Sequence, residues 1–400
     1  MLRKLGDKAT TRLKHPDFSP ALTRCRRHYS ERTGTVPSVE LPPPIDWRNI
    51  FKTTPVLVRD RISLRNLETA TDLAPVLVPD MKDHPAMQRT RENREPEGSV
   101  IIEAFPGPGA LTRGLMKLPR SRVRRIIVLE DYGQYYDWLK PLEEVDDRVT
   151  VVQRSGYFWD TYPILEEMGL LDDVQTYPWE QLHPSLRFIA HVPHNIPGEQ
   201  LVNQFYRNIP DRAWLYKYGR MPMNLIMGEW LWQRISAPAG SNTRCKLSII
   251  AEALASSSLA VPRDRLLPYD DHFHPTTSKM SPHQEKRPEA RRIGHPHVVV
   301  NVTPKEHVAI APGQLEKWDY VLRRLFVLKS TALRSAIGSL APGAAALIKP
   351  IAATGVDIKQ PIKKLSLDDW AKIVKVFDEW PFAPEDLLIS ESFNPDTSRV

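Results

Sequence analysis

The stretch Glu103-Ala-Phe-Pro-Gly-Pro-Gly-Ala-Leu-Thr112 decides the fold of this chain. An apolar run, Val100 to Ile102, precedes it, and helical spacing of apolar residues follows it up to Leu118. A strand, a glycine turn and a helix in this order place backbone N–H groups and a helix N-terminus against a nucleotide or nucleoside. Glu130 ends the next apolar run, where a carboxylate can accept hydrogen bonds from two ribose hydroxyls. The predicted cofactor-binding residues are Glu103, Gly107, Gly109 and Glu130.

Short apolar runs alternate with helical patterns over the following two hundred residues. Strands are expected at 126–130, 149–152, 186–191, 212–218 and 297–303, and helices at 63–78, 132–142, 224–235 and 246–254, with Pro75 ending the first helix early. This alternation predicts βαβ units and an α/β fold with a parallel, doubly wound sheet. The 27 residues between Glu103 and Glu130 exceed the spacing of about 20 in dinucleotide folds, so a class I methyltransferase (Rossmann-like) sheet fits better than a dehydrogenase.

The pattern becomes purely helical after the last expected strand. Helical spacing at 315–326, 332–340, 344–348 and 367–377 predicts a small all-helical C-terminal domain. The expected organisation is a leader over 1–33, a Pro-rich connector over 34–58, the α/β domain over 59–304, the helical domain over 305–383 and a polar tail over 384–400. Residues 262–296, rich in Pro, His and charge, are expected to be a surface insertion within the α/β domain.

The positive charge of the chain is concentrated at its N-terminus. Residues 1–33 contribute a net charge of +6 to the total of +7, and they mix Arg and Lys with Ser and Thr. This composition is typical of a mitochondrial transit peptide, so the mitochondrial matrix is the expected compartment; a solvated basic arm that binds nucleic acid is the alternative. Two cysteines are too few for a disulfide framework, and no apolar run is long enough to span a bilayer, so no membrane association is expected.

Three segments, in this order, resemble the rRNA adenine N6-dimethyltransferases and the mitochondrial transcription factors B derived from them. The segment 103–112 is similar to the family's E-x-G-P-G-x-G-A-L-T, 189–196 falls where the family has A-N-L-P-Y-N-I, and 320–339 looks like its C-terminal F-x-x-R-R-K-T-L helix pair. The resemblance covers roughly residues 59–388. It implies a methyltransferase fold followed by helices, and S-adenosylmethionine as the cofactor of active members.

The departures from the family pattern decide which branch is expected. The family's Asn-Leu-Pro-Tyr, which holds the target adenine, is His191-Val192-Pro193-His194 here. Phe105 stands in place of the first loop glycine, and Ser155-Gly156 replaces the Asp-Ala that would bind the cofactor's adenine amine. The resemblance therefore implies a transcription initiation factor whose catalytic positions 191–194 are degenerate, which binds no cofactor, and which assists the single-subunit mitochondrial RNA polymerase in opening promoter DNA. An active rRNA dimethyltransferase that uses S-adenosylmethionine and an rRNA-binding assembly factor are the alternatives.

Two groups of residues are candidates for binding nucleic acid. The aromatic run Tyr157-Phe158-Trp159 follows the third strand and is either core packing or a platform on which unpaired bases stack. Local basic patches include Arg120 to Arg125 and Lys286 to Arg292, and the patch chosen for phosphate contacts comprises Arg323, Arg324, Lys329 and Arg334. The histidines near 183–194 and 272–297 lack cysteine or carboxylate partners at ligand spacing, so no metal site is expected.

Overall fold

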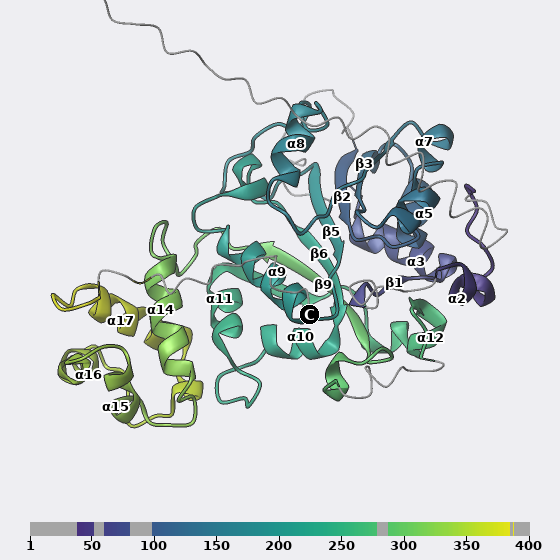
Figure 1. The fold of residues 1–400 in the computed structure, drawn as a ribbon. Coiled ribbons are helices and arrows are strands. Elements are labelled where there is room, and N and C mark those ends of the chain that lie inside the picture. The colour runs from purple at the N-terminus through teal and green to yellow at the C-terminus, as the bar shows by residue number, and fades with distance from the viewer. Residues whose placement is uncertain (1–37, 52–59, 81–97, 278–286, 385–386, 388–400) are drawn as a thin grey trace, which may run out of the picture. The chain divides into compact units, whose positions relative to one another are not determined.

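A seven-stranded sheet forms the centre of the molecule (Figure 1). The computed structural model describes residues 38–51, 60–80, 98–277, 287–384 and 387. Among these residues no helix is long and apolar enough to cross a membrane. The strand order is β4 (Val149–Val152), β3 (Val123–Leu129), β2 (Ser99–Ala104), β5 (Leu186–His191), β6 (Met223–Gly228), β9 (His297–Pro304) and β7 (Ala255–Leu259).

The sheet is mixed rather than entirely parallel. Strands β4 to β6 run parallel, whereas β9 pairs antiparallel with β6 and β7 pairs antiparallel with β9. The strands expected at 126–130, 149–152, 186–191 and 297–303 are confirmed. The parallel part matches the methyltransferase-like architecture that the sequence predicted, and the glycine loop lies at the carboxyl end of β2.

Two predicted elements after β5 are wrong. The expected strand 212–218 contains the 3-10 helix η4 (Trp214–Tyr218), and the expected helix 224–235 is divided between β6 and α10 (Glu229–Ile235). Every residue of β6 is buried, and periodicity cannot distinguish such a short apolar run from a buried helix. Strand β7 was missed because its serines have low β-propensity.

Helices cover both faces of the sheet. One face packs against α3 (Leu67–Leu77), α5 (Ala110–Met116) and α6 (Gly133–Leu139). The other packs against α8 (Thr161–Glu167), α9 (Ile196–Arg207), α10 and α11 (Lys246–Leu254). Successive side chains of β2 alternate between the two cores, as strand geometry requires. Helix α3 runs past Pro75 to Leu77, so the expectation that the proline ends it early is wrong.

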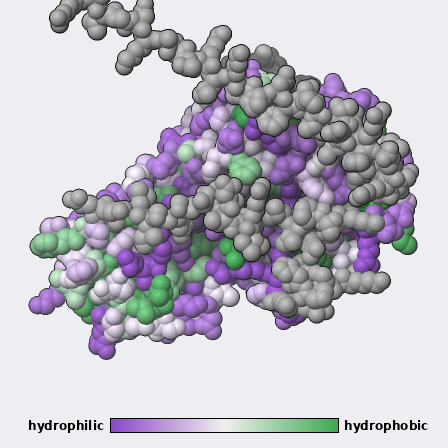
Figure 2. Space-filling view, viewed as in Figure 1, coloured by the Kyte–Doolittle hydropathy of each residue, from purple (hydrophilic) through white to green (hydrophobic). Residues whose placement is uncertain are grey.

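The C-terminal helices predicted from spacing are present. They are α14 (Leu315–Phe326), α15 (Leu333–Ala336), α16 (Ile348–Ala353) and α17 (Leu367–Asp378), with short 3-10 turns between them. Helices α14 and α17 contact α11, and the buried Trp318, Trp370 and Phe377 extend the core beneath that helix. Figure 2 shows hydrophobic surface over this helical region at the lower left, where the exposed apolar residues include Val327 and Phe382.

The described part of the 262–296 segment is more ordered than a surface loop. It contains η5 (Arg263–Leu266), α12 (Tyr269–His272), β8 (Phe273–His274) and η6 (Glu289–Arg291). Strand β8 pairs antiparallel with β1 (Ser63–Leu64), and Phe273 is fully buried. Elements of two to four residues are too short to leave a periodic pattern, which is why the sequence did not reveal them.

Candidate functional site

The glycine turn after β2 forms as its sequence predicted. Gly107 and Gly109 have φ angles of +63° and +90°, a conformation that L side chains rarely adopt. A Cβ on Gly107 would lie 2.2 Å from the Ser63 hydroxyl oxygen, so both conformation and space require glycine there. The turn lies against the end of β3, because the Gly107 N–H donates to Glu130 Oε2 over 3.2 Å.

The Glu130 carboxylate is already occupied by an arginine of the same chain. Arg61 Nη2 donates to Glu130 Oε2 at 2.7 Å and to Oε1 at 2.9 Å, and Arg61 Nη1 donates to Asp131 at 2.9 Å. The Tyr132 N–H adds a further bond to Oε1 at 3.0 Å. Burial raises the pKa of Glu130 to about 7, against the opposing effect of Arg61. The carboxylate expected to receive two ribose hydroxyls is therefore engaged in a buried ion pair.

Phe105 fills the neighbouring space. Its ring is buried, the Arg61 guanidinium carbon lies 4.7 Å from the ring centroid, and its ring atoms are 3.5 Å from where a Cβ on Gly156 would stand. The φ of Phe105 is +60°, in the left-handed region where a bulky side chain is strained. The backbone has thus kept a conformation suited to glycine while the side chain is phenylalanine, and the ring spans from the end of β2 toward the end of β4.

These residues do not fit S-adenosylmethionine. The ribose would need the Glu130 oxygens that Arg61 holds, and the amino-acid moiety would need the space that the Phe105 ring occupies. Ser155, which replaces the aspartate of the family pattern, is buried, and its hydroxyl oxygen accepts from the Tyr157 N–H at 3.3 Å. No carboxylate stands there to bind an adenine amine.

Glu103 begins the loop motif but is not a binding group in this arrangement. It is fully buried, and the Thr112 hydroxyl donates to its Oε2 at 2.7 Å. Burial raises the pKa of Glu103 to about 8, so its carboxyl group is mostly protonated at neutral pH. Its Oε1 has no hydrogen-bond partner within the part of the chain that the structure describes. Glu103 therefore joins β2 to α5 as a neutral hydrogen-bonding group.

The segment His191-Val192-Pro193-His194 is buried where active relatives would receive a base. His191 Nε2 accepts from the Leu64 N–H at 3.4 Å, and burial lowers the pKa of His191 to about 3. The His194 ring lies 4.9 Å from the ring of His297, and its Nδ1 accepts from the Trp230 indole at 3.4 Å. Both rings are at most 2% exposed, so neither presents a face on which a base could stack.

The buried histidines do not form a metal centre. Burial lowers the pKa of His297 to about 4, and the pKa of His194 is lowered mainly by burial as well, so both rings are neutral. Among the described residues, no group of three or more His, Cys, Asp or Glu side chains could hold a metal ion. The rings of His194 and His297 are tilted by only 34°, an arrangement that packs their faces together. The cluster is therefore a packed histidine core.

The aromatic run lies on the surface. Tyr157 is half-buried, whereas Phe158 and Trp159 are 50% and 39% exposed. Trp159 packs edge-on against Trp214 at 5.8 Å and lies 6.1 Å from Tyr162, which holds one side of its ring in place. An exposed ring supported from behind is the geometry that base stacking needs. The stacking role itself stays a prediction.

The basic residues of the helical region that are predicted to contact phosphates occupy different environments. Arg324 and Arg334 are exposed, and the Arg324 guanidinium lies 5.5 Å from the Tyr320 ring centroid. Arg323 and Lys329 are half-buried, and Lys329 Nζ donates to the Asn242 carbonyl at 2.8 Å. By contrast, the basic patch Arg120 to Arg125, at the start of β3, is largely neutralised by ion pairs of Arg120 with Asp147 and of Arg124 and Arg125 with Asp173. The helical region therefore retains the freer positive charge.

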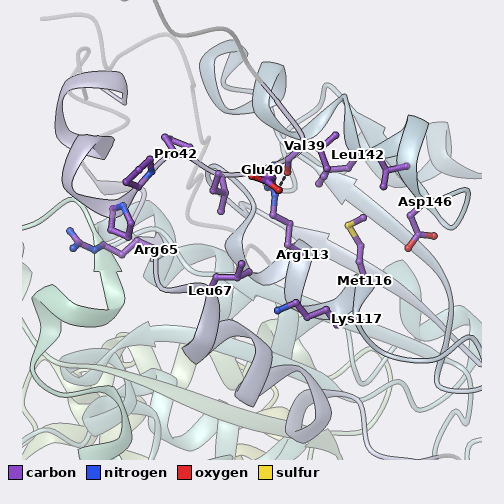
Figure 3. Close-up of a pocket in the computed structure, with 14 residues that line it drawn as sticks. Val39, Glu40, Pro42, Arg65, Leu67, Arg113, Met116, Lys117, Leu142 and Asp146 are labelled. Carbon is purple, nitrogen blue, oxygen red and sulfur yellow. Dashed lines mark hydrogen bonds between the residues drawn. The ribbon is translucent and has the colours of Figure 1, made fainter.

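A cavity of about 690 Å³ lies beside α5 (Figure 3). Residues 39–44, Arg65 and the outer side of α5 and α7 (Leu142–Val145) line it. Arg113 closes its inner wall by donating to the carbonyls of Val39 at 2.8 Å and Trp138 at 3.0 Å. Neither Phe105 nor Glu130 is among its lining residues, so the cavity does not include the space beside Glu130.

The sequence did not reveal the role of Arg61. This residue closes the cofactor cradle, the space between the glycine turn 106–109 and Glu130 that a cofactor would occupy. Arg61 lies far from the loop in sequence and belongs to no spacing motif, so only the fold brings it to Glu130. The one signal available was indirect: Phe105 and Ser155 already indicated that the cofactor's contacts were lost. An arginine replacing a ligand's hydrogen bonds is consistent with that loss.

Comparison with known proteins places the chain in one family. Mitochondrial transcription factor 1 of Saccharomyces cerevisiae is 25% identical over 311 residues, which is 75% of this chain and 85% of that protein. The Lachancea kluyveri protein of the same name is 26% identical over 71% of this chain and 82% of its own length. Human mitochondrial dimethyladenosine transferase 1 is 24% identical over 50% of this chain and 54% of that protein.

A solved dimethyladenosine transferase from Plasmodium falciparum superposes over 79% of this chain and 97% of its own, with 14% identity and a TM-score of 0.47. The family match itself comes from the sequence and extends from the segment before β2 to the end of α17. Because residues 83–379 match the ribosomal RNA adenine dimethylase family, the chain belongs to that family, as its three motifs predicted.

Proposed function

We propose that this protein is a mitochondrial transcription initiation factor that assists a single-subunit mitochondrial RNA polymerase in opening promoter DNA. The observation that carries the proposal is the closed cofactor cradle, in which Arg61 holds Glu130 and Phe105 fills the space beside it. A methyltransferase needs that space for its methyl donor. The similarity to mitochondrial transcription factors over most of the chain also supports a role in transcription.

The proposed contact with DNA combines two surfaces. Phe158 and Trp159 would stack on unpaired bases, a contact that is indifferent to base identity. Arg323, Arg324, Lys329 and Arg334 would meet phosphates, which makes binding sensitive to salt. With little net charge beyond residue 33, the chain would attract duplex DNA weakly and would prefer single-stranded or bubble DNA. Residues 1–33, outside the described residues, would direct the protein to the mitochondrial matrix.

Two other functions use the same fold. An active small-subunit rRNA dimethyltransferase would need Arg61 and Phe105 to vacate the cradle, which costs a buried ion pair and a packed ring. An rRNA-binding assembly factor would need no cofactor and could use the same basic surface. The partner recovered with the protein distinguishes the proposed function from the assembly factor: RNA polymerase in one case, the small ribosomal subunit in the other.

Transcription with the polymerase of the same source tests the proposal. The factor should stimulate run-off transcription strongly on a fully duplex promoter, and much less on the same promoter premelted around the start site, because the premelted template no longer needs opening. A parallel reaction should measure transfer of tritium-labelled methyl groups to unmodified small-subunit rRNA. Methyl transfer without stimulation of transcription would overturn the proposal in favour of the dimethyltransferase. Equal stimulation on both templates would argue against a role in opening.

A further inference from the structure

A second cavity lies at the opposite end of the sheet from the glycine loop. Its volume is about 370 Å³, and it is lined by the amino ends of β5 and β6, by β9 and β7, and by the end of α3. Arg187 of β5 and Asn224 of β6 are the most deeply buried polar residues in its wall, with 6% and 4% exposure. This size suits a ligand no larger than a small metabolite.

Polar side chains form a row across this face of the sheet. Asn224 pairs in register with Asn301, and Asn301 pairs with Ser258, so all three side chains point to the same face. Asn224 also pairs in register with Ile189, and Arg187 precedes Ile189 by two residues on β5, so the arginine lies on that face as well. Asn224 Nδ2 donates to Asn301 Oδ1 at 2.6 Å, which fixes both amides in the cavity wall.

Among the residues that the structure describes, the Arg187 guanidinium has no anionic partner. No acidic side chain of the described ranges acts on Arg187, and its Nε has no hydrogen-bond acceptor there. Burial, aided by the nearby positive charge of Arg122, lowers the pKa of Arg187 to about 10, so the group still carries its charge at neutral pH. Arg122 is itself only partly satisfied, with one bond to the Pro75 carbonyl at 3.0 Å and an Nε that lacks an acceptor in the described structure.

Another arginine at the same end of the sheet shows what a structural arginine does in this fold. Arg148 directly precedes β4 and is nearly as buried as Arg187, at 8% exposure. It pairs with Asp146 at 2.7 Å and donates to the Leu118 and Val123 carbonyls at 2.7 and 3.2 Å. A buried cation without such partners is unfavourable, so an unpaired arginine in a cavity wall indicates a ligand that supplies the missing charge.

We propose that this cavity binds a phosphate monoester of the size of a nucleoside monophosphate, with the phosphate on Arg187. A planar guanidinium binds phosphate in a bidentate manner, and the positive charge of Arg122, which acts on Arg187 although Arg122 does not line the cavity, favours a dianion over the single charge of a carboxylate. Leu182, Pro222 and Val76 supply an apolar wall for a base. Asn224 Oδ1 lacks a donor among the described residues, so a sugar hydroxyl or an exocyclic amine would find an acceptor there.

Titration calorimetry on the full chain in phosphate-free buffer tests this site with three probes: adenosine monophosphate, inorganic phosphate and adenosine. Adenosine monophosphate should bind, and adenosine should bind at least tenfold more weakly because it lacks the phosphate. The inorganic phosphate arm identifies the source of the anion: affinity equal to that of the ester would assign the site to free phosphate, and weaker affinity to the ester. Equal affinity for adenosine monophosphate and adenosine would overturn the proposal without any variant.

Variants place the ligand at Arg187. Arg187→Met should reduce affinity for adenosine monophosphate at least tenfold, and it should raise the melting temperature of the ligand-free protein because an unpaired buried charge is removed. Asn301→Leu should weaken binding less. Arg124→Met is the matched control, since Arg124 lies at the same sheet end but pairs with Asp173; it should bind the nucleotide as the unmodified chain does. Unchanged affinity in Arg187→Met would show that the nucleotide binds elsewhere and would overturn the proposal.

Discussion

The two ends of the parallel strands hold arginine in opposite ways. At the carboxyl end, Arg61 is paired: two carboxylates accept hydrogen bonds from its Nη atoms, and an aromatic ring lies against its guanidinium group. At the amino end, Arg187 lines a cavity with no acidic partner among the described residues. In parallel α/β sheets ligands bind at the carboxyl end, so the usual site is closed here while a cavity remains at the other end.

This difference shows that side chains can occupy a family's cofactor site while the backbone around the site keeps its conformation. The glycine turn, the Glu130 position and the positive φ at residue 105 are all retained, yet the chain's own side chains stand where a ligand would bind. The internal ion pair stabilises the end of the sheet in place of a cofactor. If this comparison is correct, disrupting the carboxyl end should cost stability, whereas removing Arg187 should not.

The largest effect is expected from Arg61→Met. The substitution leaves Glu130 buried without its cation, and breaking a buried pair in this way costs about 3 to 5 kcal/mol of unfolding free energy. Urea denaturation at pH 8 measures it. Arg265→Met is the control, because Arg265 pairs with Asp72 on the surface and should cost about 0 to 1 kcal/mol. Equal losses of unfolding free energy in the two variants would show that the buried Arg61–Glu130 pair contributes no more than the exposed Arg265–Asp72 pair.

Phe105→Gly separates the effect of the Phe105 ring from that of the Arg61–Glu130 ion pair. Losing a buried ring costs about 3 to 5 kcal/mol, and relieving the positive φ returns about 1 to 2 kcal/mol, so the net loss of unfolding free energy should be about 1 to 4 kcal/mol. The variant should still fail to bind S-adenosylmethionine, because Arg61 remains on Glu130. Combining it with Arg61→Ala should give measurable binding by calorimetry. Binding by the single variant would show that the ion pair does not block the site.

Trp159→Ala tests whether the surface beside the closed cradle has become a binding surface. It should weaken binding to bubble DNA by about 1 to 3 kcal/mol and leave duplex binding unchanged, because stacking requires unpaired bases. Fluorescence anisotropy on matched substrates gives both values. As the control, Arg324→Ala should weaken both substrates alike and reduce the salt dependence. Equal loss on both substrates for Trp159→Ala would instead assign the ring a structural role.

The smallest effect is a pH dependence that distinguishes the ends. His297, at the carboxyl end, has a pKa lowered by burial to about 4, so the unfolded chain binds its proton first as pH falls below 6.5. Stability attributable to this ring is fully present above pH 6.5 and is lost toward pH 4 at up to about 1.4 kcal/mol per pH unit. His297→Phe should reduce the slope of unfolding free energy against pH, measured from pH 7 to 5.

Arg187→Met is the comparison for that slope. The pKa of Arg187, about 10, lies far above the measured range, so the group keeps its charge in both states and the variant should leave the slope as it was. A slope unaffected by His297→Phe would contradict the neutral histidine core at the carboxyl end.

The sequence was sufficient for four of the five parallel strands, β2 to β5, and for the C-terminal helices. Those elements have clear apolar periodicity and turn signals, and the glycine motif identifies the switch from strand to helix at Gly109. It failed at β6 and β7, because Met223–Gly228 is apolar on both faces and Ala255–Leu259 is mostly serine. The first segment pairs with β5 and β9 and the second pairs with β9, and these long-range contacts are not encoded in the local pattern.

At the candidate site, the sequence showed that residues of the family's cofactor motifs are replaced, but it did not show that Arg61 occupies the place of the cofactor. Phe105 and Ser155 are visible as departures from a motif, since their positions are fixed by neighbouring residues. Arg61 and Arg187 carry no such signal, because an arginine is read as solvated unless the fold shows it buried. Their opposite environments depend on which carboxylates the fold brings near them, and that information lies only in the three-dimensional structure.

Calorimetric titration of the unmodified chain with S-adenosylmethionine tests the central claim most directly. With Arg61 on Glu130 and Phe105 in the adjoining space, we expect no binding tighter than a dissociation constant of ~1 mM, equivalent to about 4 kcal/mol. A micromolar dissociation constant would mean that the cradle opens at little cost, and it would contradict both the closed site and the proposal that this chain acts in transcription without methylating.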